Sequence, residues 1–186
     1  MAKVLIVGNI TKDVYLRFDN RLNKFEEDQY GVNWLDLAFN HSSYKFYARA
    51  SVYGGASVSL EVLSRFNIDA QIINTPARFI DGQFYANESQ IDYRYILCHD
   101  NDISYLTPST FRESAWVTPV EAPDWIYIDR SANITPILGD KISSYLARNT
   151  GTRLAIFISK RSSQNSMYMR KLLQRASLII ADTKLY

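Results

Sequence analysis

Residues 4–13 read VLIVGNITKD. Val4–Val7 form an unbroken apolar run that Gly8 and Asn9 close, which is typical of a parallel strand covered on both faces. The same pattern recurs four times along the chain, and the five runs together predict one mainly parallel sheet. The other four are Ala70–Ile73, Trp125–Ile128, Leu154–Ile158 and Leu178–Ile180.

Helices are expected between these runs, because apolar residues recur there at spacings of three and four. They cover Ser57–Phe66, Pro136–Arg148 and Met167–Arg175. Short apolar runs that alternate with helical patterns indicate an α/β protein in which helices flank the parallel sheet.

Three further segments follow a different pattern. Val14–Phe18, Tyr44–Val52 and Ile91–Leu97 are rich in aromatic and β-branched residues with partial alternation. Such segments favour antiparallel strands with one face open to water. The polar stretch 19–31 between the first two is predicted to be a loop. The sequence therefore predicts a small antiparallel flap that grows out of the parallel sheet.

Composition limits the function classes. The 186 residues carry a net charge of +2, and the densest basic group is the pair Lys160 and Arg161, so we expect no nucleic-acid partner. No apolar run approaches the roughly 20 residues of a membrane span, so we expect no membrane partner. Cys98 is the only cysteine, which excludes an intramolecular disulfide and fits a cytoplasmic protein.

Residues 53–66 read YGGASVSLEVLSRF, and together with residues 4–13 they resemble the ribokinase (PfkB) family of sugar and nucleoside kinases. The resemblance implies a ribokinase-like α/β fold with an antiparallel β lid, formed by strands within about 14–52 and 84–106 of a single domain, 1–186. It implies ATP and magnesium as cofactors, a sugar or nucleoside as ligand, and a homo-oligomer, such as a dimer, that forms through the lid.

The same resemblance assigns ligand-binding roles to Asp13, Gly54, Gly55 and Ser59. A carboxylate near the carboxyl end of a parallel strand can accept hydrogen bonds from neighbouring ligand hydroxyls. A glycine pair supplies backbone freedom and lets a ligand approach the main chain. From the residues alone, a solvated Asp13 and an ordinary tight turn at the glycines remain alternatives.

Several positions depart from the family pattern. Ser59 stands where the family has a substrate-binding asparagine, and Asp182–Leu185 replaces an Asn-x-x-Glu motif, with Asp182 as a partial substitute on the phosphate and metal side. The chain contains no Gly-Ala-Gly-Asp segment, which in the family forms the anion hole and supplies the catalytic base. We therefore expect no catalytic residue and no protein-built metal site in this chain, and expect it to carry the substrate-side portion of a kinase with an incomplete C-terminal half.

Two functions follow from these observations. The first is a kinase that transfers the ATP γ-phosphoryl group to a sugar or nucleoside hydroxyl, with this chain inactive by itself. The second is a non-catalytic small-ligand-binding or assembly module derived from the same fold. A Gly-Ala-Gly-Asp segment encoded after Tyr186 would favour the first. The sequence has no Gly-x-Gly-x-x-Gly or Gly-x-x-x-x-Gly-Lys motif and no zinc-ligand spacing, so other nucleotide and zinc sites are excluded.

Overall fold

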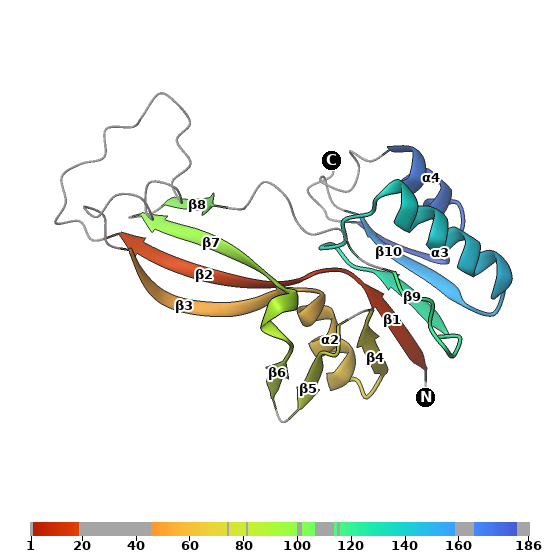
Figure 1. The fold of residues 1–186 in the computed structure, drawn as a ribbon, viewed down its shortest axis with the longest axis horizontal. Helices are drawn as coiled ribbons and strands as arrows, with labels where there is room; N and C mark the ends of the chain where they lie inside the picture. The colour runs from red at the N-terminus through yellow and green to blue at the C-terminus, as the bar shows by residue number, and fades with distance from the viewer. Residues whose placement is uncertain are drawn as a thin grey trace. The chain divides into compact units, whose positions relative to one another are not determined.

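A computed structural model describes residues 2–18, 46–73, 75–80, 82–99, 102–106, 114, 116–158 and 166–181. The chain forms two compact units. The first comprises Met1–Thr11, Tyr53–Asp92 and Phe111–Tyr186, and the second comprises Lys12–Val52 and Tyr93–Thr110. Figure 1 shows the elements of both.

The first unit is built on a five-stranded sheet in the order β11-β10-β9-β1-β4. All four neighbouring pairs are parallel, and Val7 of β1 lies opposite Ile128 of β9. Each of the five predicted apolar runs forms one of these strands, so the prediction of a mainly parallel sheet is confirmed. The strands are β1 (Lys3–Val7), β4 (Asp69–Ile72), β9 (Trp125–Ile128), β10 (Arg153–Ile158) and β11 (Leu178–Ala181).

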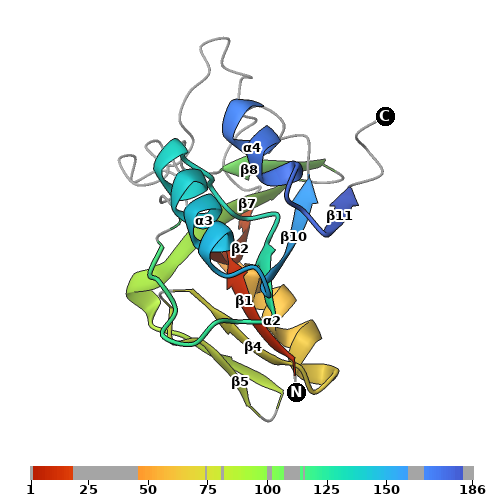
Figure 2. The ribbon, with the colours of Figure 1, turned by 90° about the vertical axis from the view of Figure 1, so that its right-hand side faces the viewer.

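Among the described residues, three helices flank this sheet, as the apolar spacing predicts. They are α2 (Ala56–Arg65), α3 (Pro136–Arg148) and α4 (Ser166–Leu173). Helix α3 begins where the Thr135 hydroxyl accepts a hydrogen bond from the Leu138 amide and where Pro136 occupies the first turn. Figure 2 shows α2 and α3 on opposite sides of β1.

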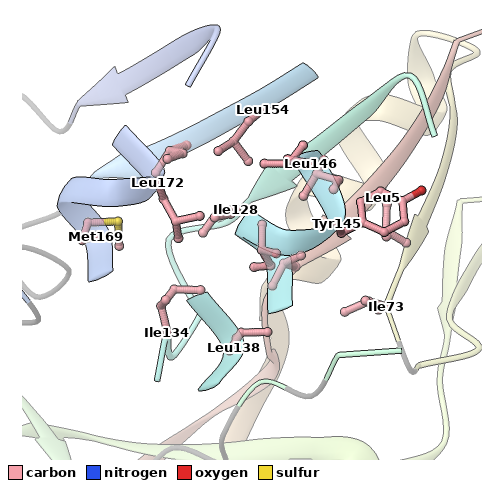
Figure 3. Close-up of a cluster of buried hydrophobic side chains, with 14 residues drawn as sticks. Leu5, Ile73, Ile128, Ile134, Leu138, Tyr145, Leu146, Leu154, Met169 and Leu172 are labelled. Atoms are coloured by element: carbon pink, nitrogen blue, oxygen red, sulfur yellow. The ribbon is translucent and has the colours of Figure 1, made fainter. Parts of the chain in front are cut away.

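The core of the first unit lies between the sheet and the pair α3 and α4 (Figure 3). Alternate residues of β1, β9 and β10 point into it, among them Leu5, Ile128 and Leu154, and the helices contribute Leu138 and Leu172. Burial of one such side chain contributes about 1.5–3 kcal/mol, so this layer supplies much of the folding free energy.

A second sheet holds four strands in the order β3-β2-β7-β8. They are β2 (Ile10–Phe18), β3 (Phe46–Gly55), β7 (Ile91–His99) and β8 (Asp102–Leu106), and β7 pairs with β8 in antiparallel fashion. The predicted flap segments Val14–Phe18 and Ile91–Leu97 fall within β2 and β7, and residues 46–52 of the third fall within β3, while residues 44 and 45 lie outside the described residues. Strand β8 lies within the range 84–106 that the resemblance implied for the lid strands, although the residue pattern did not single it out.

A short hairpin in the first unit was also not predicted. It joins β5 (Arg78–Ile80) to β6 (Gln83–Tyr85) through Gly82, which has φ +78°, and the 3-10 turn η1 (Glu88–Gln90) follows. The dipeptide Asp81-Gly82 between two short apolar runs is a recognised hairpin signal, so the information was present in the sequence.

Strand β11 lies at one edge of the parallel sheet, and all four of its residues are exposed. Leu178, Ile179 and Ile180 are between 38% and 49% exposed. In the portion of the chain with described coordinates, none of the helices has the length and apolarity that a membrane crossing requires.

Candidate functional site

Gly55 joins β3 to α2 in a conformation that favours glycine. Its φ is +66°, and a Cβ atom at this position would overlap the carbonyl oxygen of Asn9. The next residue, Ala56, donates its amide proton to that same carbonyl over 3.0 Å. Gly55 therefore allows the first turn of α2 to begin directly against the chain that leaves β1.

Gly8 makes a second close approach, at the carboxyl end of β1. A Cβ atom there would lie 2.8 Å from the Asp129 Cβ and 2.9 Å from the Ser131 Oγ. Real Cβ atoms do not come so near to other heavy atoms, so only glycine fits between β1 and the segment that follows β9. As a result, Asp129 and Ser131 lie beside the start of α2.

Asp129 is the centre of the resulting group of polar side chains. Its Oδ1 accepts hydrogen bonds from the Ser131 amide at 2.8 Å and from the Ser131 Oγ at 2.6 Å. Its Oδ2 accepts a third from the Ser59 Oγ at 2.5 Å. The residue is only 6% exposed, and a carboxylate buried to that degree needs such donors.

Tyr127 lies next to this group on β9. Burial raises the pKa of the Tyr127 phenol, the charge of Asp129 raises that pKa further, and a hydrogen bond with Ser59 lowers it in part. Tyr127, Ser59 and Asp129 therefore share one partly enclosed environment, in which the phenol stays protonated at neutral pH.

Asn9, in the segment after β1, forms hydrogen bonds with residues of the loop after β9 and with Ser114. Its amide donates to the Ser131 Oγ at 3.0 Å, and its Oδ1 accepts from the Ser114 Oγ at 2.8 Å. Ser114 in turn accepts from the amide of Asn133 at 3.1 Å. These contacts fix the positions of both loops at the carboxyl edge of the sheet.

Three of the residues that the sequence singled out meet here. Gly54 is buried and its carbonyl accepts from the Ser57 Oγ at 2.8 Å, Gly55 starts the helix, and Ser59 binds Asp129. Sequence reasoning missed Asp129 and Ser131. A signal for Asp129 existed, because it follows the apolar run Trp125–Ile128 directly and so stands at a strand end, where open α/β sheets bind ligands.

Asp13 belongs to the second unit and lies within β2. Both of its oxygens bind Arg94 of β7: Arg94 Nε donates to Oδ1 at 2.5 Å, and a terminal guanidinium nitrogen donates to Oδ2. The Asp13 side chain is 14% exposed, and the Arg94 side chain is 28% exposed. Asp13 is therefore a partly buried, ion-paired carboxylate.

The residues that the structure describes include no cluster of three or more metal-ligating side chains. Asp182, which the resemblance places on the phosphate and metal side, lies outside them. Within the described ranges, no group of three or more His, Cys, Asp or Glu side chains comes together in a way that could hold a metal ion.

A scan against protein-family models found no match, and a search of curated proteins found none either. Among solved structures, the chain is similar to a protein from Staphylococcus aureus described as a phosphofructokinase, with 10% identity and a TM-score of 0.42. That match covers 97% of this chain and 71% of the other.

The chain is also similar to the tetrameric inhibited form of phosphofructokinase-2 from Escherichia coli, with 8% identity and a TM-score of 0.47. This second match covers 98% of the chain but only 62% of the Escherichia coli protein, so the chain spans less than two thirds of that protein's length. At these identities and TM-scores, the function has to be argued from the chain's own residues.

Proposed function

We propose that the chain binds a sugar or a nucleoside and is the substrate-side portion of a ribokinase-type kinase, which transfers the ATP γ-phosphoryl group to a ligand hydroxyl. The observation that carries this proposal is the hydrogen bond between Ser59 and Asp129 beside Gly55. It brings a residue of the Gly-Gly helix together with a carboxylate at the carboxyl edge of the parallel sheet.

The position of this group supports a binding role. The carboxyl ends of β1 and β9 are neighbours, since Val7 lies opposite Ile128, and the polar residues follow each strand directly. Open α/β sheets bind their ligands in the crevice outside the carboxyl ends of the strands. Neither Gly8 nor Gly55 leaves space for a side chain. The loops after β1 and β9 and the start of α2 therefore approach one another more closely than any other residue type would permit.

The chemistry of the residues supports a ligand rich in hydroxyl groups. Carboxylate and hydroxyl oxygens accept hydrogen bonds from hydroxyls, and bonds to a charged acceptor are the stronger kind. The proposal assigns Asp13 to the ligand as well. Arg94 takes one bond at each Asp13 oxygen, and each carboxylate oxygen can accept a second.

We expect this chain by itself to bind the sugar or nucleoside without transferring a phosphoryl group to it. Phosphoryl transfer depends on positioned donors and on electrostatic stabilisation of the transferring group. The 186 residues contain no Gly-Ala-Gly-Asp segment. We therefore assign to this chain the binding of the acceptor, and to other parts of a complete kinase the nucleotide contacts and the base.

Calorimetric titration with a panel of neutral sugars and nucleosides tests this proposal. At least one compound should bind, and Asp13→Ala should weaken it by about 10-fold or more, which corresponds to about 1.4 kcal/mol. Ser144→Ala, on the exposed side of α3, is the matched control and should leave the affinity unchanged. Absence of binding across the panel would refute the proposal. In a parallel assay, the chain should show no ATP-dependent phosphorylation of the bound compound.

The second candidate is a non-catalytic binding module. Ser59 in place of the family's asparagine and Asp182–Leu185 in place of its Asn-x-x-Glu motif favour it. Both candidates predict ligand binding and no turnover by this chain, so the distinction lies in the complete reading frame. A Gly-Ala-Gly-Asp segment encoded after Tyr186 supports the kinase, and its absence supports the module.

A further inference from the structure

Helices α3 and α4 share an outer face that carries an excess of positive charge. Residues 130–181 contain nine lysines and arginines against one acid, Asp140, whereas the rest of the chain has a net charge of −6. These cations are scattered along the sequence, so no run of them stands out there. The fold gathers several of them, because α3 and α4 lie beside each other on the same side of the parallel sheet (Figure 2).

Contacts between the two helices place their basic side chains on one surface. The Lys171 ammonium on α4 lies 3.9 Å from the Asp140 carboxylate on α3, and the Arg175 guanidinium donates to the Ser143 carbonyl at 3.3 Å. This basic face comprises the exposed residues Lys141, Arg148, Lys171 and Arg175. Apart from the Lys171–Asp140 pair, none of these cations is paired with a carboxylate of the described residues. Four cations therefore share one carboxylate.

A groove runs along α3 at the basic face. Ile137, Lys141 and Arg148 line one side of it, since intervals of four and seven residues are close to one and two helical turns. Trp116 lines the other side, and its indole packs edge-on against the Tyr145 ring at a centroid distance of 5.5 Å. The groove has a volume of about 450 Å³ and is open to solvent. Its apolar part is the indole and Ile137, which is 63% exposed.

We propose that the basic face and its groove dock an extended acidic segment of a partner protein, in which an apolar side chain is followed by several carboxylates. The apolar side chain lies against Ile137 and Trp116, and the carboxylates pair with Lys141 and Arg148. This inference goes beyond the proposed function and does not depend on it, because the residues that line the groove differ from those of the Ser59–Asp129 group.

The length of the groove suits a short extended peptide. Ile137 and Arg148 are eleven residues apart, a rise of about 16 Å along an α-helix, which about five residues of extended chain span. Alternate side chains of an extended chain point to the same side, at intervals of roughly 7 Å. With an apolar side chain at Ile137, the second residue after it comes beside Lys141 and the fourth comes within reach of Arg148.

The charge pattern favours an acidic peptide over a nucleic acid. Single strands bind where successive bases stack on aromatic rings, and among the described residues that line the groove only Trp116 is aromatic. A long polyanion that continued past the basic face would also meet the net negative charge of the rest of the chain. Asp140, which lines the groove as well, can accept a backbone amide proton from a peptide but repels a phosphodiester.

Calorimetric titration of the full 186-residue chain with short peptides tests the proposal. The probe is Phe-Glu-Glu-Asp-Glu with acetylated and amidated ends. It should bind at least about 10-fold more tightly than Phe-Gln-Gln-Asn-Gln, which lacks the charges, and than Ala-Glu-Glu-Asp-Glu, which lacks the apolar anchor. Raising sodium chloride from about 0.05 M to about 0.5 M should weaken binding by about 10-fold or more, because salt screens exposed charges.

Substitutions at exposed positions locate the bound peptide. Lys141→Gln and Arg148→Gln should each weaken binding of the acidic probe by about 5-fold, and Ile137→Ser should reduce the preference for Phe over Ala at the first position to about 2-fold. Arg78→Gln removes an exposed charge of the same kind from β5 and is the matched control, with an expected change of less than about 2-fold. All four side chains are exposed, so we expect each variant to keep the melting temperature of the original chain.

Three results overturn the inference. The first is equal affinity for the acidic and the neutral peptide, or no binding of the acidic probe at about 1 mM. The second is a loss in Arg78→Gln as large as the loss in Lys141→Gln. The third is tighter binding of oligodeoxythymidine or of phosphatidylserine vesicles than of the peptide, abolished by Lys141→Gln and Arg148→Gln, which would assign the basic face to a nucleic acid or to a membrane surface.

Discussion

Arg94 binds both carboxylate oxygens of Asp13, and the pair joins neighbouring strands β7 and β2 of the four-stranded sheet. A bidentate pair fixes the carboxylate in orientation as well as in position. Because both side chains are largely buried, solvent screens the pair less than it screens the exposed pair of Arg65 and Glu61 on α2.

Arg94→Met should therefore destabilise the second unit by about 1–3 kcal/mol, since it leaves Asp13 partly buried without its partner. Arg65→Met, which removes the exposed helix pair, should cost about 0.5 kcal/mol or less. Urea unfolding of both variants measures the difference. A double-mutant cycle of Arg94→Met with Asp13→Asn should return a favourable coupling energy for the pair. Equal losses of unfolding free energy in Arg94→Met and in Arg65→Met would contradict the expectation.

Gly55→Ala should be far more costly than Gly82→Ala. Both glycines have positive φ, +66° and +78°, so both substitutions introduce the backbone strain of about 1 kcal/mol. Only at Gly55 does the new Cβ overlap a backbone oxygen, whereas nothing lies within 4 Å at Gly82. We expect Gly55→Ala to lower the free energy of unfolding by about 3 kcal/mol or more, or to prevent folding. Similar melting temperatures for the two variants would argue against the close approach.

Thr11→Val should stabilise the chain, and Thr152→Val should destabilise it. Both threonines are buried, but the Thr11 hydroxyl has no hydrogen-bond partner among the residues that the structure describes, whereas the Thr152 hydroxyl donates to the Pro123 carbonyl at 2.8 Å. An unsatisfied buried hydroxyl costs about 1–3 kcal/mol, and removal of a satisfied one leaves its acceptor unpaired. Opposite signs of the change in melting temperature are the expected result, and the same sign for both would count against it.

The stability of the chain should fall as pH rises above about 10, the ordinary pKa of tyrosine. The folded state raises the Tyr127 pKa above that value, so the unfolded chain loses the proton first and alkaline pH favours unfolding. The contribution is present in full below pH 10 and disappears as pH passes the folded pKa. Tyr127→Phe should reduce the slope of unfolding free energy against pH between 9 and 11. Tyr85→Phe, on the exposed hairpin, is the surface control.

Self-association through the four-stranded sheet remains a prediction of the sequence. Val52 of β3, the last residue of this segment that belongs to the second unit, is 56% exposed, and the aromatic Tyr53 follows it. A thin sheet has two faces, and an apolar face without cover favours a partner. Light scattering with size exclusion should show an oligomer at micromolar concentration that Val52→Asp dissociates. Dissociation by Leu178→Asp instead would assign the contact to β11, and a 21.4 kDa species across a tenfold dilution would refute association.

The sequence predicted the parts of the fold that depend on local pattern. Apolar runs such as Val4–Val7 recur in the strands of the parallel sheet, and in β1 and β10 burial on both faces explains why successive positions are apolar. Strand β8 (Asp102–Leu106) escaped, because five mixed residues carry no clear period and pairing with β7 decides their structure. Tertiary pairing overrides propensity at such short segments.

The candidate site could be predicted only where its residues follow a local pattern. The pair Gly54 and Gly55 indicates a turn because glycine has great backbone freedom, and Ser59 follows the pair in the first turn of one helix. Its partner Asp129 is 70 residues further on, and no local period joins the two. Only the parallel register of β1 with β9 brings them together. Arg94 and Asp13 are likewise 81 residues apart.

Strand β11 has a practical consequence for anyone who produces this protein. Leu178–Ala181 contains no charge, no proline and no bulge, which are the devices that stop other chains from adding to a sheet edge. Among the described residues, no strand pairs with the outer side of β11, and such an edge is a template on which an extended segment of a nascent or partly unfolded polypeptide can add. A strongly charged tag fused just beyond this strand would act as a gatekeeper and should raise the recombinant yield of monodisperse protein more than the same tag at the N-terminus.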